Sequence, residues 1–123
     1  MSTVRSTGFV MNLDEFIAQA LNHGMRNSYV DEPGFDTLYV RVATRFLDGQ
    51  RMKTIDLAVI GASVPGGGAF TKLVARLREQ YPTMTIFVES VQTERFRDKL
   101  REMGFVEREW EPYNFYLLPK KME

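Results

Sequence analysis

The sequence predicts a mixed α/β fold: a mostly antiparallel sheet with a central parallel pair of strands, flanked by helices. Three observations support this prediction. The run from Ile55 to Ile60 is apolar and β-branched, as is typical of a buried strand. Apolar residues then recur at helical spacing from Ala69 to Tyr81, and a second strand-like run follows at Thr83 to Val88. A strand, a helix and a strand in this order form a parallel pair with a right-handed crossover.

Size and composition limit the possible functions. The 123 residues fit one domain, residues 1–123, and the 44% hydrophobic content allows a packed core. With no cysteine and one histidine, the chain lacks a thiol nucleophile and we expect no metal site. A formal net charge of zero argues against non-specific nucleic-acid binding. No apolar run approaches the roughly 20 residues of a membrane helix and no signal-peptide pattern is evident, so we expect a cytoplasmic protein.

The N-terminal third predicts one helix. Met1 to Gly8 is polar, and a short strand is expected around Phe9 to Met11. Asn12 can cap a helix that Gly24 ends. His23, in the last turn of this helix, is interpreted as a surface or capping residue rather than a catalytic one.

A hairpin is expected to precede the parallel pair. Arg26 to Asp36 is interpreted as a loop, and Thr37 to Leu47 is rich in β-forming residues. Asp48-Gly49-Gln50 is typical of a hairpin turn, so this strand should pair antiparallel with the next one.

The C-terminal part predicts a helix and a second hairpin. Thr93 can cap a helix that Gly104 ends. Phe105 to Trp110 and Asn114 to Leu118 are expected to form the last antiparallel pair.

The loop from Gly61 to Gly68 indicates where a ligand could bind. Gly66, Gly67 and Gly68 carry no Cβ, so a ligand could approach the backbone and meet free N–H groups at a positive helix end. The loop matches neither the nucleoside-triphosphate motif nor the dinucleotide motif GxGxxG. A flexible connector is the alternative interpretation, and a phosphate-bearing ligand of another class remains open.

Two segments together resemble the GNAT N-acetyltransferase superfamily, and the resemblance covers about Leu38 to Leu118. The first is the strand, glycine loop and Leu-rich helix, which is similar to the family's acetyl-CoA motif. The second is the following strand and a helix that closes with Gly-Phe. The residues that carry the likeness are Ala58-Val59-Ile60, Pro65 to Phe70, Leu73, Val74, Leu77, Ile86-Phe87-Val88, Thr93, Phe96, Leu100 and Gly104-Phe105. The short chain also resembles small GNAT-like proteins of bacteriophages.

The resemblance implies that acetyl-CoA is the cofactor. In the family, the strand before the loop splays from the strand after the helix, and the pantetheine arm lies between them. Ala58 and Ile60 would bond this arm, and N–H groups from Gly66 to Phe70 would hold the pyrophosphate. The implied cofactor-binding residues are Ala58, Val59, Ile60, Pro65, Gly66, Gly67, Gly68, Ala69, Phe70, Thr93 and Lys99. Arg95 and Lys99 could meet phosphates, although a solvated helix face is the alternative.

The chain departs from the family pattern at four positions. Pro65 stands where arginine or glutamine is usual, and Phe70 replaces a small residue. Thr93 replaces a frequent asparagine. Leu100 occupies the position of a tyrosine that often protonates the departing thiolate, and leucine cannot donate a proton.

Acetyl transfer to an amine requires a general base and a polarised thioester carbonyl. A backbone N–H of Val59 or Ile60 could polarise the carbonyl. Alternation along the strand places Asp56 on one face with Ala58 and Ile60, which makes it the first candidate base, with a hydrogen-bonded structural role as the alternative. Glu89 is the second candidate, with a surface carboxylate as the alternative.

The resemblance thus implies an N-acetyltransferase whose acceptor is an amine. Because the part before Thr37 is short, the acceptor side is expected to be open, which suits a protein acceptor or completion by a second subunit in a homodimer. The alternative is a weak or inactive GNAT-like module that acts by binding or inhibiting another protein.

Overall fold

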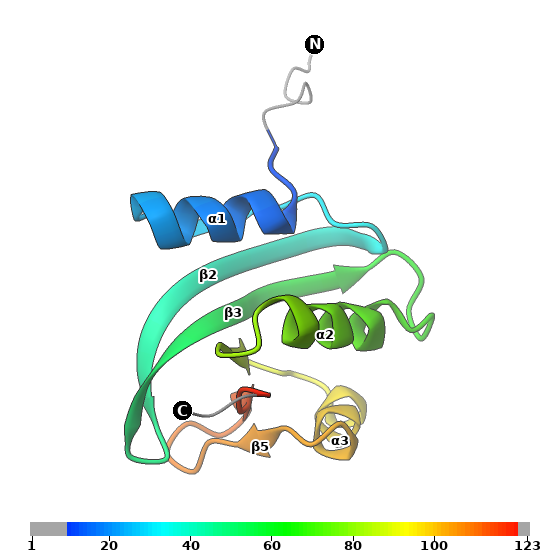
Figure 1. The fold of residues 1–123 in the computed structure, drawn as a ribbon. Coiled ribbons are helices and arrows are strands. Elements are labelled where there is room, and N and C mark those ends of the chain that lie inside the picture. The colour runs from blue at the N-terminus through cyan, green and yellow to red at the C-terminus, as the bar shows by residue number, and fades with distance from the viewer. Residues whose placement is uncertain (1–9, 121–123) are drawn as a thin grey trace.

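The computed structural model describes residues 10–120. Over this range the chain forms a six-stranded sheet in the order β1-β2-β3-β4-β6-β5, together with three helices (Figure 1). Among the described strands, only β3 and β4 run parallel, and every other neighbouring pair is antiparallel. The predicted mixed fold with one central parallel pair is therefore confirmed. The elements are α1 (Leu13–His23), β1 (Asn27–Tyr29), β2 (Phe35–Leu47), β3 (Gln50–Ala62), α2 (Ala69–Gln80), β4 (Thr85–Val88), α3 (Glu94–Glu102), β5 (Val106–Glu107) and β6 (Phe115–Leu117).

The helices begin and end where the sequence predicts. The Asn12 side chain accepts the Glu15 N–H at 2.8 Å, and the Glu15 carboxylate accepts the Asn12 N–H at 3.0 Å, so a capping box opens α1. Gly24 ends α1 with φ +78°, a left-handed conformation that glycine adopts without strain. Thr93 caps α3 by accepting the Phe96 N–H at 3.2 Å.

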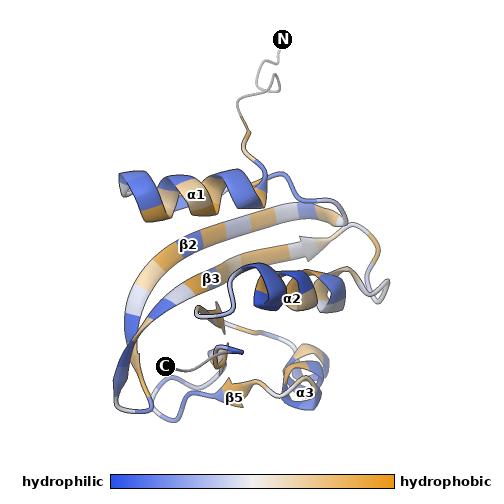
Figure 2. Cartoon of the chain, in the orientation of Figure 1, coloured by the Kyte–Doolittle hydropathy of each residue, from blue (hydrophilic) through white to orange (hydrophobic). Residues whose placement is uncertain are grey.

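All three helices pack on one face of the sheet. Leu13, Phe16 and Ile17 of α1, with apolar residues of α2 and α3, join the inward residues of the strands in one large cluster. Figure 2 shows apolar residues on the side of α1 that faces β2. The other face carries a smaller cluster, which contains no helix residue: Leu47, Met52, Phe87, Tyr116 and the partly buried Leu118.

The β2–β3 hairpin is longer than the rest of the sheet, and it bends toward the C-terminal strands (Figure 1). The Tyr116 hydroxyl donates to the Asp48 carboxylate at 2.6 Å, which ties the hairpin turn to β6. Leu47 and Met52 from the hairpin bury Phe87 and Tyr116. The hairpin itself thus covers the part of the second face nearest its turn.

Three strand predictions need correction. The expected loop from Arg26 to Asp36 contains β1, because Asn27 to Tyr29 pair with β2. The expected strand at Phe9 to Met11 is reduced to an isolated bridge between Asn12 and Asp31, and Phe9 lies outside the described residues. The strand expected over residues 105–110 is limited to β5, because the loop that follows turns back to β6.

Candidate active site at the β3–β4 splay

The parallel pair separates at a β-bulge. The register between β3 and β4 ends at Leu57 opposite Val88, and the last cross-strand bond joins the Glu89 N–H to the Leu57 carbonyl at 3.2 Å. On the β2 side, Tyr39 pairs with Val59 and Val40 pairs with Leu57, so Ala58 is an extra residue. From Ala58 to Ala62, β3 has a described partner only on the β2 side. The splay expected from the GNAT resemblance is present.

The bulge changes the face that the following residues occupy. Leu57 and Ile60 both pack in the large cluster beneath the helices, whereas Asp56 pairs with Arg41 on the opposite face. The prediction that Asp56 shares a face with Ile60 is therefore wrong. It assumed unbroken alternation, and one inserted residue reverses the alternation beyond it.

The glycine loop leaves its backbone accessible. Gly66 and Gly68 have φ +77° and +88°, and a Cβ built on either residue would meet nothing within 4 Å. Gly68 caps α2 without a side-chain hydrogen bond, and the first intrahelical bond runs from the Lys72 N–H to the Gly68 carbonyl at 3.1 Å. The N–H groups of the first helical turn therefore have no intrahelical acceptor and can bind an anion. The residues present fit a diphosphate seat.

A cavity of about 520 Å³ lies beside the loop, between α2 and the segment that leads into β2. Pro33, Phe35, Val64 and Leu73 supply apolar walls, and Lys72 supplies a cation. The Arg76 guanidinium closes one side through a 2.5 Å bond to Glu32. The glycine loop thus forms one wall of this cavity.

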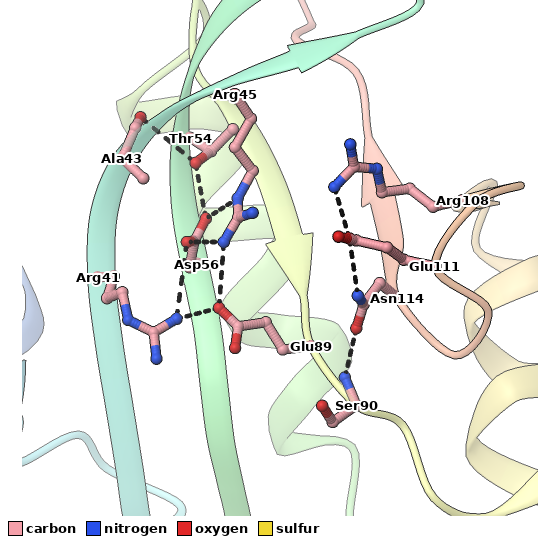
Figure 3. A network of polar contacts seen from close by, with 10 residues as sticks. All are labelled: Arg41, Ala43, Arg45, Thr54, Asp56, Glu89, Ser90, Arg108, Glu111 and Asn114. Carbon is pink, nitrogen blue, oxygen red and sulfur yellow. Dashed lines mark hydrogen bonds and ion pairs between the residues drawn. The ribbon is translucent and has the colours of Figure 1, made fainter.

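Both predicted carboxylates lie in one cluster of charges on the sheet face that none of the three described helices covers (Figure 3). Asp56 is fully buried, accepting from the Thr54 hydroxyl at 2.6 Å and from Arg45 at 2.7 Å. The Glu89 side chain is 20% exposed, bonds Arg41, and lies 3.3 Å from Arg45. Arg41 also lies 4.0 Å from Asp56. The structure therefore joins the two candidate bases through shared guanidinium groups.

The carboxylates of the cluster act on the pKa of Arg45. Burial acts to lower the pKa of Arg45, but the hydrogen bond and charge of Asp56, with the charge of Glu89, raise it above its usual value. The Arg45 guanidinium also lies 4.0 Å from the centre of the Phe87 ring, where a cation is attracted to the ring face. Two guanidiniums and two carboxylates leave the cluster without net charge.

The other predicted residues have different surroundings. The Phe70 side chain is buried against Phe96, with ring centres 5.1 Å apart, so only its backbone remains for a ligand. The Thr93 hydroxyl caps α3. Lys99 is exposed on the same helix, and Leu100 is fully buried in the large cluster.

Arg41 and Arg45 are the site residues that sequence reasoning missed. They are four residues apart in a predicted strand, and even spacing puts both on one face. Two arginines on one face of a strand that pairs with the strand of Asp56 could have predicted an ion pair with this carboxylate. The hydrogen bonds to Asp56 and Glu89 now explain why the cluster tolerates burial.

No protein-family model and no curated protein sequence matches the chain. Similar folds exist among solved structures. A tyrosine-to-phenylalanine mutant of the toxin AtaT, bound to acetyl-CoA and to the C-terminus of the antitoxin AtaR, superposes with a TM-score of 0.55. Identity is 14%, over 85% of this chain and 73% of the toxin chain. The KacTA–DNA complex gives a TM-score of 0.55 and 17% identity, over 93% of this chain and 84% of that one.

The fold is GNAT-like. AtaT in complex with acetyl-methionyl-tRNAfMet is a third similar structure, with a TM-score of 0.50, 15% identity, and coverage of 85% of this chain and 76% of that one. At such identities the likeness concerns the GNAT-like fold, and the predicted fold class is confirmed.

Two further findings concern the described part of this GNAT-like chain. None of its helices is long and apolar enough to cross a membrane. Its histidine and acidic side chains form no group of three or more that could hold a metal ion.

Proposed function

We propose that the chain is an acetyl-CoA-dependent N-acetyltransferase whose acceptor is an amine. One observation carries the proposal: the β3 edge loses its β4 partner at Ala58, and the same strand leads directly to the open glycine loop before α2. A strand edge without a partner can bind the amides of an extended ligand, and the start of α2 can bind its phosphates. The overall fold superposes on the toxin AtaT, solved with acetyl-CoA, and on the KacTA complex, each with a TM-score of 0.55.

Specific residues would hold the cofactor. The backbones of Ala58, Val59 and Ile60 would bond the pantetheine arm and polarise the thioester carbonyl. The loop from Pro65 to Gly68 and the N–H groups of Ala69 and Phe70 would hold the diphosphate. Thr93 caps the start of α3, and Lys99 lies in the last turn of the same helix with an exposed side chain that would meet a phosphate. When bound, acetyl-CoA would supply an acetyl carbon that gains a bond to the amine nitrogen as its bond to sulfur breaks.

The two carboxylates would have different tasks. Glu89 follows the last paired residue of β4 and its side chain is partly exposed, so it can accept the proton that the amine releases. Asp56 has no exposed surface, and its hydrogen bonds hold Arg45. We therefore assign Asp56 as a positioning residue. Leu100 offers no proton for the sulfur, so water would supply that proton.

The loop assignment is tested by ligand-induced stabilisation. Acetyl-CoA bound at micromolar Kd and present at millimolar concentration should stabilise the fold by about 4 kcal/mol. Gly68→Glu should abolish this gain by placing charge and bulk in the seat. Gly49→Glu is the matched control, because Gly49 also has a left-handed φ of +75° and open surroundings but lies in the β2–β3 turn. Full stabilisation of Gly68→Glu would refute the assignment.

A second function is favoured by Leu100 and Pro65, which replace two family residues with ones that lack a functional group. The chain would then be a GNAT-like binding or inhibitory module. Stabilisation by coenzyme A and acetyl-CoA alike, without thiol release against any amine, would favour this alternative. The acceptor panel should include proteins, free amines and aminoacyl groups, because AtaT is found with acetyl-methionyl-tRNAfMet. Sedimentation would test the homodimer.

A further inference from the structure

Three neighbouring strands place an apolar row on the sheet face opposite the described helices. Tyr29 of β1 pairs with Tyr39 of β2, and Tyr39 pairs with Val59 of β3. The two tyrosine rings lie 4.7 Å apart. Tyr29 is 61% exposed and Val59 is 46% exposed. We call Tyr29, Tyr39 and Val59 the aromatic row.

The aromatic row borders the proposed reaction site. Val59 directly follows the bulge residue Ala58, where β3 loses its β4 partner. Arg41 is the next residue of β2 on the same face; its guanidinium lies 5.7 Å from the Tyr39 ring and bonds Glu89. Same-face residues of one strand lie about 7 Å apart. Arg41 therefore links the row to Glu89, the carboxylate that would accept the proton of the amine.

The charges beside the row indicate which acceptor fits. Arg41, Arg45, Asp56 and Glu89 cancel one another, so a charged acceptor side chain gains no net attraction there. An apolar acceptor side chain would bind favourably, because packing against two tyrosine rings and a valine removes its apolar surface from water. The acceptor amine needs only Glu89, the partly exposed carboxylate of the cluster.

We infer that the aromatic row is a specificity surface for an acceptor whose reacting α-amine is next to a large apolar side chain. This inference rests on the proposed acetyltransferase function. It assigns substrate selection to Tyr29, Tyr39 and Val59, which come from three strands and lie outside the glycine loop. The acceptor can be an N-terminal or an aminoacyl residue, because both present the same amine and side chain.

Amino-acid amides test the inference directly. Thiol release from acetyl-CoA is measured with leucinamide, methioninamide, phenylalaninamide, glycinamide and glutamate amide. We expect kcat/KM for the three apolar amides to exceed that for glycinamide by about 10- to 100-fold. Tyr39→Ala and Tyr29→Ala should reduce this ratio mainly through KM, and Tyr39→Phe should keep it. Phe46→Ala is the matched control, since Phe46 is a 66% exposed aromatic residue near the hairpin turn.

Binding without turnover separates this inference from the proposed function. Ring resonances of Tyr29 and Tyr39 are followed while each amide is added, and thermal unfolding verifies that each variant is folded. Ring resonances that shift with leucinamide but not with glycinamide would support the role of the aromatic row in selecting the acceptor. If no amide were then acetylated, that result would count only against the proposed acetyltransferase activity. Equal kcat/KM or equal shifts for the two amides would overturn the inference. So would a dimer that Tyr39→Ala dissociates, because a second copy would then occupy the row.

Discussion

Asp56→Asn should destabilise the fold by about 2–3 kcal/mol. Removing one partner of a buried ion pair typically costs about 3–5 kcal/mol, because the other charge stays buried without compensation. Here the remaining charge is on Arg45, whose side chain is 24% exposed and keeps Glu89 at 3.3 Å. Because Arg45 remains partly solvated and keeps a second carboxylate, the expected loss of stability is smaller than that for a fully buried, unpaired charge.

Urea denaturation measures this loss. With a slope of about 1–2 kcal/mol/M for a small domain, the unfolding midpoint should fall by about 1–3 M. Arg45→Met and the double variant complete a thermodynamic cycle, and a coupling of at least about 1 kcal/mol is expected for groups in direct contact. Asp98→Asn is the matched control, because Asp98 forms an exposed pair with Arg101 and should change stability by less than about 0.5 kcal/mol.

The result also separates two roles for Asp56. If Asp56→Asn unfolds within about 0.5 kcal/mol of the original chain, or shows no coupling to Arg45, the anchoring role is refuted. A stable Asp56→Asn protein that has lost acetyl transfer would instead support a direct role in proton transfer. Glu89→Gln provides the comparison, since its partly exposed side chain predicts a smaller loss of stability and a larger loss of kcat.

Two further predictions concern other parts of the fold. Burial, with the hydrogen bond and charge of Asp14, raises the pKa of Tyr81 from 10.0 to about 12. The contribution of Tyr81 to the free energy of unfolding is therefore present below pH 10 and is lost as the pH rises toward 12. In Tyr81→Phe, the urea midpoint should depend less on pH between about 9.5 and 11.5. Gly34→Ala should destabilise the fold by about 2 kcal/mol or more, because φ is +93° and the new Cβ would lie 2.9 Å from the Ala69 Cβ. Gly24→Ala is the control: with φ +78° and no atom near the new Cβ, it should destabilise the fold only through backbone strain, by about 1 kcal/mol.

Local signals predicted most of the fold. Asn12, Gly24, Thr93 and Gly104 mark helix ends through interactions within a few residues, so the sequence around each one is sufficient. β1 was missed for the opposite reason. Its three residues, Asn27 to Tyr29, have no continuous apolar pattern, and the strand exists because β2 offers an edge for pairing.

The site was predicted in part. The glycine loop and the splay follow from a strand, glycine, helix order that is visible in the chain. The ion cluster depends on cross-strand register, which brings Arg41 opposite Asp56, and on the separation of β4, which brings Glu89 to the same guanidiniums. The side chains come from β2, from β3 and from the residue after β4, so no single stretch of sequence predicts their contact.

The bulge at Ala58 links the error about Asp56 to the surface proposed for the acceptor. In the sequence Ala58-Val59-Ile60, every residue is apolar, so the pattern does not reveal which one is extra. With unbroken alternation, Val59 would enter the helix-covered core and Ile60 would join Asp56 on the other face. The inserted residue instead puts Ile60 in the core and Val59 beside Tyr39. The same backbone irregularity thus separates Asp56 from Ile60, coincides with the end of β4 pairing, and completes the aromatic row.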